Sequence, residues 1–148
     1  MTDALLVTVH AGTAAVWLGA MLYSLLVVQP RAVAALDDPE PLYVALAAGA
    51  RWKVIAMVGV LAASGAGLIL AEDDPSSAWV VLVAIKTVLL IAALSLFAHV
   101  SWRMWPARLF ALPDELPAHR RRFRIVALAL TVLVSTAFVL GTVAQSLG

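Results

Sequence analysis

The sequence predicts an all-α integral membrane protein, a four-helix up-and-down bundle formed by a single transmembrane domain over residues 1–148. The chain is 64% hydrophobic and 13% charged, with a mean hydropathy of +1.00, whereas soluble domains are roughly half apolar and a quarter charged. Four apolar stretches are long enough to cross a hydrocarbon core about 30 Å thick, which takes roughly 20 helical residues. In addition, the basic residues are concentrated in alternate connections.

The four expected membrane helices cover residues of about 4–28, 54–71, 78–100 and 125–145. The chain begins Met-Thr-Asp, without the basic start of a signal peptide. Its first apolar run also exceeds the usual 7–15 residues of a signal peptide's apolar region, so we expect a permanent first helix.

Prolines and serines predict where these helices begin and end. The first helix is expected to end near Pro30, and a helical pattern resumes after Pro41 as an interfacial helix over about 41–52. Pro75 and the two serines that follow it are expected to start the third helix, so the second and third helices form an antiparallel hairpin.

The charged residues predict the orientation in the membrane. The N-terminus and the 72–77 turn contain acidic residues but no Lys or Arg. The connections 29–53 and 101–124 hold Arg31, Arg51, Lys53, Arg103, Arg108, Arg120, Arg121, Arg122 and Arg124. The positive-inside rule therefore predicts a protein of the cytoplasmic membrane with cytoplasmic basic loops and both termini outside. The HRRRFR run at 119–124 is expected to contact anionic lipid.

The composition also restricts the partners and the chemistry. A formal net charge of +1, distributed by side of the membrane, does not indicate a nucleic-acid partner. The expected partners are the lipid bilayer, a redox or metal-delivery protein and a second copy of the chain. The absence of cysteine excludes disulfides, thiolate metal sites and iron–sulfur clusters. No phosphate-binding loop, Ser/His/Asp order or pair of intramembrane carboxylates is present, which sets nucleotide and hydrolase chemistry aside.

His10 and Lys86 are the two ionisable residues expected well inside the membrane, where such groups are costly and face a bundle interior, a partner or a cavity. Counting about 1.5 Å per residue from the helix starts places both roughly 9–12 Å below the outer boundary. A polar pocket between them in the outer half of the bundle is therefore expected. The second and fourth helices cross this layer near Ser64 and Gly65, and near Gly141 and Thr142.

Each of these residues allows more than one interpretation. His10 is a hydrogen-bonded structural histidine, an axial haem ligand, a copper ligand or a proton-transfer group. Lys86 either extends toward the outer headgroups or pairs with a buried anion such as a haem propionate. His99 is an interfacial anchor or, alternatively, a metal ligand. It lies about 20 Å from the layer of His10, so the two cannot ligate one iron. Trp17 lies on the His10 face of the first helix, because seven residues make nearly two turns.

The order of these residues resembles two membrane families, the copper-resistance protein D family and the HemJ-type protoporphyrinogen oxidases. The likeness is in His10 followed by Trp17-Leu18-Gly19-Ala20, in Arg51-Trp52 leading to Ser64-Gly65, in Trp79 followed by Lys86, and in His119 with Arg122-Phe123-Arg124. It extends over most of the chain. In helix four the chain lacks the acidic stretch and closing Lys-Pro of the HemJ proteins, so the resemblance does not carry protoporphyrinogen oxidation over to it.

The resemblance to the HemJ proteins implies a bundle that binds b-type haem for electron transfer or haem metabolism, as a membrane oxidoreductase. His10 would be the axial ligand and Lys86 the propionate partner, with Trp17 below the ring and glycines such as Gly19 allowing close approach. The copper-resistance relatives imply copper transport or tolerance without haem, although methionine-rich and histidine-rich outer segments are missing here. A non-catalytic anchor or assembly subunit, docking through its basic loops, is the remaining alternative.

Overall fold

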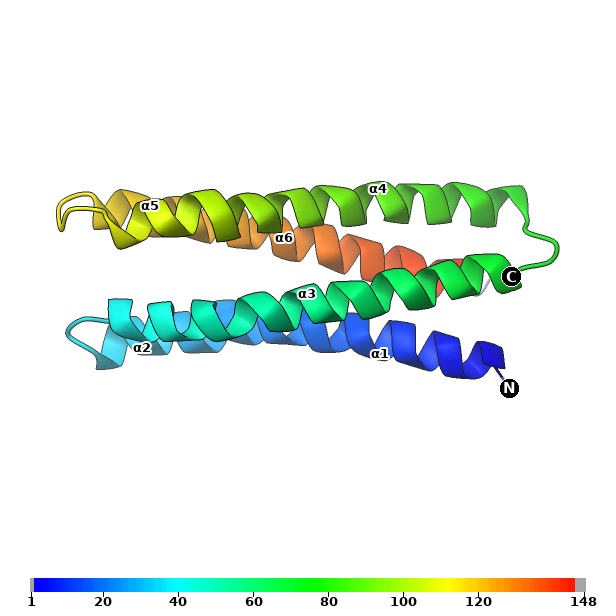
Figure 1. Cartoon of the computed structure of the whole chain (residues 1–148), viewed down its shortest axis with the longest axis horizontal. Coiled ribbons are helices and arrows are strands. Elements are labelled where there is room, and N and C mark those ends of the chain that lie inside the picture. Colours follow the sequence, from blue (N-terminus) through cyan, green and yellow to red (C-terminus); the bar gives the residue numbers. More distant parts are fainter. Residues whose placement is uncertain (1, 146–148) are drawn as a thin grey trace. The chain divides into compact units, whose positions relative to one another are not determined.

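The computed structural model describes residues 2–145, which form helices joined by short turns, with no strand among them (Figure 1). In chain order the helical elements are α1 (Thr2–Tyr23), η1 (Ser24–Val28), α2 (Gln29–Ala35), α3 (Glu40–Ala71), α4 (Ser77–His99), η2 (Val100–Met104), α5 (Trp105–Leu109) and α6 (Leu116–Gln145). The elements η1 and η2 are π-helical turns.

Four helical stretches of the described chain are long and apolar enough to cross a membrane: Ala4–Ala35, Glu40–Ala71, Ser77–Leu109 and Leu116–Ala144. The stretch Ala4–Ala35 has 32 residues, about 48 Å of helix, against a hydrocarbon core of about 30 Å. The helices therefore extend beyond the apolar segments by which the sequence located them. The expected segments 41–52 and 54–71 are parts of one continuous helix, α3.

The helices exceed their expected lengths mainly within the segments 29–53 and 101–124, where the basic residues are concentrated. We call these segments the basic ends of the two pairs of helices. Helical structure continues past Pro30 to Ala35, and α3, the helix that packs against α1, already begins at Glu40. Charged and polar side chains interrupt the apolar pattern there, but a helix still satisfies the hydrogen-bonding groups of the backbone. At the opposite end, α3 ends at Ala71 and α4 begins at Ser77, close to the expected positions.

Local chemistry explains the start of α4 and the two π-helical turns. Ser76 caps α4 by accepting a hydrogen bond from the backbone N–H of Trp79 at 3.2 Å, which confirms the expected serine start. Each π-helical turn immediately precedes a Pro-containing helix, α2 with Pro30 and α5 with Pro106. Proline cannot donate a backbone hydrogen bond and its ring crowds the carbonyl four residues earlier, and a wider turn accommodates both effects.

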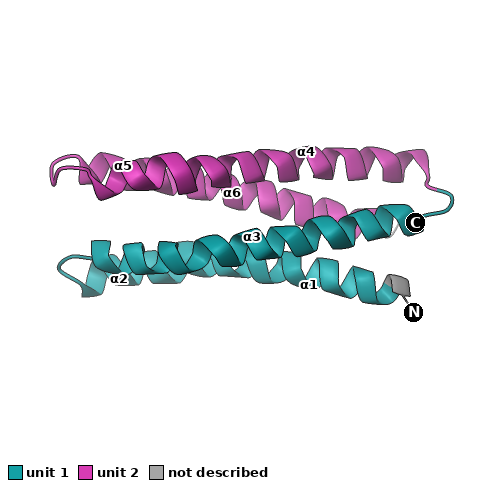
Figure 2. Ribbon diagram, in the orientation of Figure 1, with its two compact units in different colours: residues 1–74 teal, residues 75–148 magenta. Residues whose placement is uncertain are grey.

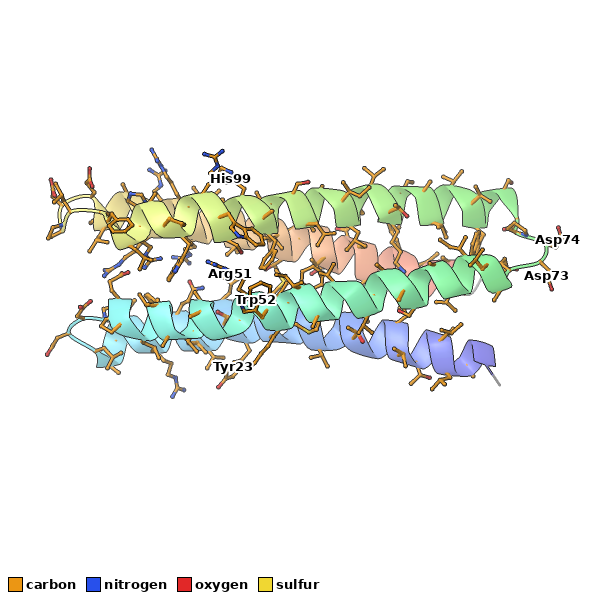
Figure 3. The ribbon with its side chains drawn as sticks, viewed as in Figure 1. Tyr23, Arg51, Trp52, Asp73, Asp74 and His99 are labelled. Atoms are coloured by element: carbon orange, nitrogen blue, oxygen red, sulfur yellow. The ribbon has the colours of Figure 1, made fainter. Side chains whose placement is uncertain are left out.

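The chain divides into two compact units, residues 1–74 and residues 75–148 (Figure 2). In the first unit α1 packs against α3, and in the second unit α4 packs against α6, so each unit is a helical hairpin. The turn between Ala71 and Ser77 carries Asp73 and Asp74, both exposed (Figure 3).

Each hairpin buries few side chains and exposes many large apolar ones. Trp17 and Leu61 are buried in the first unit, and Ala93, Leu130 and Val134 in the second. Large apolar side chains such as Leu70, at 84% exposure, and Val88, at 65%, are instead open to the surroundings. Exposed apolar surface on this scale is typical of helices solvated by lipid.

Candidate functional site

His10 is a buried polar residue of the first hairpin, with 9% of its surface exposed. It projects from α1 toward α3, where its Nδ1 lies 2.9 Å from the Oγ of Ser64. Ser64 is also buried, at 5% exposure. The expectation that Ser64 and Gly65 share the layer of His10 is therefore confirmed as direct contact.

The hydrogen bonds of Ser64 favour one tautomer of the His10 imidazole. The Ser64 hydroxyl donates to the carbonyl of Val60 at 2.6 Å, and its other close carbonyl, that of Leu61, lies at 3.4 Å. A hydroxyl has one proton, so the Ser64 oxygen accepts from His10, and Nδ1 of His10 is the donor. With the proton on Nδ1, the lone pair of the neutral imidazole lies on Nε2, and a lone pair on that nitrogen is the kind that ligates metals and accepts protons.

Gly65 provides the space for the His10 ring. A Cβ at position 65 would lie 3.1 Å from Cε1 and 3.6 Å from Nδ1 of His10. The first distance is shorter than an ordinary van der Waals contact between carbon atoms. We refer to His10, Ser64 and Gly65 together as the His10 niche. The His10 ring is held by the Ser64 hydroxyl and lies against the backbone of Gly65. This arrangement is rigid, because neither Ser64 nor Gly65 has a long flexible side chain.

Two further residues of α1 that the sequence associated with His10 lie differently from one another. Trp17 is buried, at 3% exposure, and lies nearly two turns along the same face of the helix. Gly19 is exposed, and a Cβ placed on it would meet no atom within 4 Å. Nine residues at about 100° each turn Gly19 to the opposite side of α1 from His10. Trp17 thus accompanies the niche and Gly19 does not.

Lys86 lies in the second hairpin and is half-buried. Its side chain extends from α4 over α6, where a Cβ at Gly141 would lie 2.9 Å from Nζ and 3.4 Å from Cε. We refer to Lys86 and Gly141 as the Lys86 niche. The sequence placed Gly141 at the depth of Lys86, and in the structure the two residues are in contact across the helices α4 and α6. An ammonium offers three hydrogen-bond donors and no acceptor, so its chemistry suits an anionic oxygen.

His99 is the last residue of α4 and is exposed (Figure 3). It points away from the helices of its hairpin. Among the described residues, no group of three or more His, Cys, Asp or Glu side chains could hold a metal ion.

The basic end of the second hairpin contains a buried cation that sequence reasoning did not identify. Arg108 is 7% exposed, and its guanidinium carbon lies 5.6 Å from the ring centre of Trp105 and 5.0 Å from that of Phe123. The two rings meet edge to face, 5.6 Å apart. The signal available in the sequence was the three-residue spacing of Trp105 and Arg108, which places both on one face of a helix.

In the first hairpin, a tyrosine joins the helices near the corresponding end. The hydroxyl of Tyr43, on α3, donates to the backbone carbonyl of Gln29 at 3.3 Å. Gln29 directly follows the π-helical turn η1. The bond connects α2 to α3 just beyond the widened turn.

Comparison with known proteins gives no match for this chain among protein-family models, curated proteins or solved structures.

Proposed function

We propose that this protein is a multi-pass protein of the cytoplasmic membrane that binds b-type haem through His10, in electron transfer or haem metabolism. The observation that carries the proposal is the hydrogen bond between His10 and Ser64. Histidines that ligate a metal characteristically donate their other ring N–H to a protein acceptor, which orients the ring and makes it a better ligand. His10 has such a hydrogen bond through Nδ1, and Nε2 would be the atom that ligates the iron.

Two further side chains, one in each hairpin, would suit a planar cofactor with anionic groups. Trp17 supplies a buried aromatic surface on the His10 face of α1. Lys86 is the basic residue nearest the middle of its apolar helix, and its ammonium would balance a propionate. Bound haem supplies one-electron chemistry, and the protein residues hold it, orient it and limit its contact with water. This function would make the protein a membrane oxidoreductase or a haem-handling protein.

The proposed orientation has both termini outside and the basic ends of the two hairpins in the cytoplasm. Nine basic residues lie in the segments 29–53 and 101–124, and none lies in the 72–77 turn. A hairpin crosses the membrane twice, so each returns to the side on which it began, and the two basic ends share one side. A redox or metal-delivery partner and a second copy of the chain are the proposed protein partners.

The absorption spectrum of the detergent-purified protein, after incubation with haemin, tests the proposal. We expect a Soret band that His10→Ala abolishes. The matched controls are His99→Ala and His119→Ala, which remove the other two imidazoles of the chain and leave the band unchanged. A protein without a Soret band, or one whose band survives His10→Ala, would contradict the proposal.

Two other outcomes would identify the alternatives. A colourless protein that binds one equivalent of copper, and loses it in His10→Ala, would instead be a copper transport or tolerance component. A protein that needs Arg120, Arg121 and Arg122 for co-purification with a partner, and tolerates His10→Ala, would be an anchor or assembly subunit.

A further inference from the structure

The two hairpins repeat the same order of elements at a constant shift of 76 positions. The π-helical turn begins at Ser24 in the first and at Val100 in the second. The short helix after it begins at Gln29 and Trp105, and the long returning helix begins at Glu40 and Leu116. Three element boundaries therefore coincide under one shift, without any insertion or deletion between the two halves of the chain.

Residues with strong conformational effects coincide under the same shift. Pro30 corresponds to Pro106 and Pro41 corresponds to Pro117, so two of the three prolines of the first hairpin recur in the second, whereas Pro39 corresponds to Glu115. Each recurring proline also has the same place in its element, next to the π-helical turn or at the start of the returning helix. The two hairpins thus share the positions that determine the path of the backbone.

The two niches also coincide. Lys86 is 76 positions after His10, and Gly141 is 76 positions after Gly65. In each hairpin, the polar side chain of the first helix lies over the glycine of the returning helix, at 3.1 Å from the position of a Cβ in one and at 2.9 Å in the other. The repeat gives a physical reason for the shared depth of His10 and Lys86, since both stand twenty residues before the proline that follows a π-helical turn.

We propose that the chain is a tandem repeat of one helical hairpin, and that the Lys86 niche is the second copy of the His10 niche, a polar site with an ammonium in place of an imidazole. The orienting hydroxyl differs between the copies, because Leu140 corresponds to Ser64. The second copy therefore holds a flexible hydrogen-bond donor, whereas the first holds an oriented ring. The inference does not depend on haem, because it follows from contacts within each hairpin.

Rebuilding the first niche in the second hairpin tests the equivalence. The variant Lys86→His/Leu140→Ser places histidine, serine and glycine at 86, 140 and 141, in the order of His10, Ser64 and Gly65. Ring ¹⁵N NMR of the full-length, haem-free protein in detergent distinguishes the two imidazole tautomers. We expect the imidazole introduced at position 86 to carry its proton on Nδ1 and to have ring shifts that match those of His10. The signals of His10 itself are identified by their loss in His10→Gln.

Two controls separate the niche from its surroundings. Thr87→His/Leu140→Ser moves the imidazole one position along α4, off the contact with Gly141, and should not give the Nδ1–H signature. Adding Gly141→Ala to the rebuilt niche puts a methyl group into the space of the ring. We expect that addition to abolish the signature and to lower Tm by about 3 °C or more.

Gly141→Ala in the unchanged chain should shift Tm by about 1 °C or less, because the four-carbon side chain of Lys86 can turn aside whereas a ring cannot. An equal loss of Tm in both backgrounds would overturn the inference, as would an imidazole at position 86 protonated on Nε2.

A reciprocal variant keeps the test independent of the folding of the first. His10→Lys/Ser64→Leu gives the first hairpin the residues of the second niche, and we expect a monodisperse protein with a Tm within about 5 °C of the original. If neither exchanged protein folds while His10→Gln and Lys86→Met do, the niches are not equivalent and the inference is wrong. A failure of haem binding would leave these outcomes unchanged, so the two proposals fail separately.

Discussion

The side chains of His10 and Ser64, 54 positions apart in sequence, join the two helices of the first hairpin through a buried contact of 2.9 Å. The Ser64 hydroxyl donates its hydrogen bond to the carbonyl of Val60. The contact therefore holds the imidazole in one tautomer and one orientation. A polar pair of this kind in an apolar hairpin contributes modestly to stability, about 1 kcal/mol by analogy with hydrogen bonds between membrane helices, and strongly to the definition of the site.

Replacing Ser64 tests the orientation of His10. In Ser64→Ala the Nδ1–H of His10 loses its acceptor, so the proton can move to either ring nitrogen. We expect the haem affinity to fall about 10-fold to 100-fold, the usual effect of removing such a partner. Titration of the purified protein with haemin measures it. Ser95→Ala is the matched control, because the Ser95 hydroxyl bonds only to the Ile91 carbonyl in its own exposed turn. An unchanged affinity in Ser64→Ala would show that the serine does not orient the ligand.

Glycine substitutions along α3 show which glycines are needed because another side chain lies against them. Gly65→Ala should displace the His10 ring and lower the free energy of unfolding by about 1–3 kcal/mol. Gly59→Ala, on the same helix, meets no atom within 4 Å and should be neutral or stabilising by up to about 1 kcal/mol, because alanine has the higher helix propensity. Thermal unfolding in detergent compares the two. Equal effects would mean that the Gly65 contact is relaxed in the molecule.

Gly19→Ala gives a parallel comparison on α1. Since a Cβ at this position also meets no atom within 4 Å, the substitution should leave both Tm and haem affinity unchanged. A loss of haem affinity alone in this variant would place Gly19 against the cofactor, as the family resemblance implies.

The role of Lys86 can be tested separately from iron ligation. If the ammonium balances a propionate, Lys86→Met should weaken binding of metal-free mesoporphyrin about 10-fold, a loss of roughly 1.4 kcal/mol. The same variant should leave binding of its dimethyl ester unchanged, because the ester has no carboxylate. Fluorescence titration of both ligands measures this, and Lys53→Met is the control for a basic residue outside the apolar segments. A lysine that extends to the headgroups would affect neither ligand.

The buried arginine at the basic end of the second hairpin should be sensitive to a conservative change. Arg108→Lys keeps the charge but loses the planar group that lies against Trp105 and Phe123. We expect a loss of about 1–2 kcal/mol in unfolding free energy. Arg103→Lys, at an exposed position of η2, should cost less than about 0.5 kcal/mol. Similar losses at both positions would argue against stabilisation by the aromatic contacts.

The orientation in the membrane is open to a direct measurement, because the natural sequence contains no cysteine. Asp74→Cys, in the turn before α4, should react with a membrane-impermeant maleimide in intact cells. Asp114→Cys, in the turn before α6, should react only after the membrane is permeabilised. Both positions are exposed, so accessibility to solvent alone does not distinguish them. The reverse pattern would place the basic ends outside.

Hydropathy and helical rise predicted much of this architecture, because both depend on position along one helix axis. They located four apolar helices and placed Ser64 and Gly65 at the depth of His10, and Gly141 at the depth of Lys86. They did not predict the hydrogen bond to Ser64 or the burial of Arg108, because these depend on the rotation of each helix about its axis and on packing. The apolar pattern also could not show that α3 extends back to Glu40, since a helix at a membrane surface needs no apolar periodicity.

The sequence alone does not reveal the repeat, for a different reason. Two prolines and one glycine recur at a single shift, but most other positions differ between the hairpins, and apolar residues replace one another freely on lipid-facing surfaces. The similarity becomes visible once the π-helical turns align the two halves.

These turns also bear on how the chain could tolerate a change in length. A π-helical turn contains one residue more than an α-helical path needs, so deletion of one residue within Ser24–Val28 or Val100–Met104 would leave an ordinary α-helical turn. The residues before the deletion, including His10 or Lys86, would keep their azimuth around the helix. Those beyond it, including Pro30 or Arg108, would keep nearly the same azimuth as well, because the residue removed is the extra one of the wide turn. A deletion between the polar residue and its π-helical turn would instead rotate that residue by about 100° relative to the returning helix and separate it from its glycine. The stretches Ala4–Ala35 and Ser77–Leu109 thus each have one segment in which losing a residue would leave the polar contact in place.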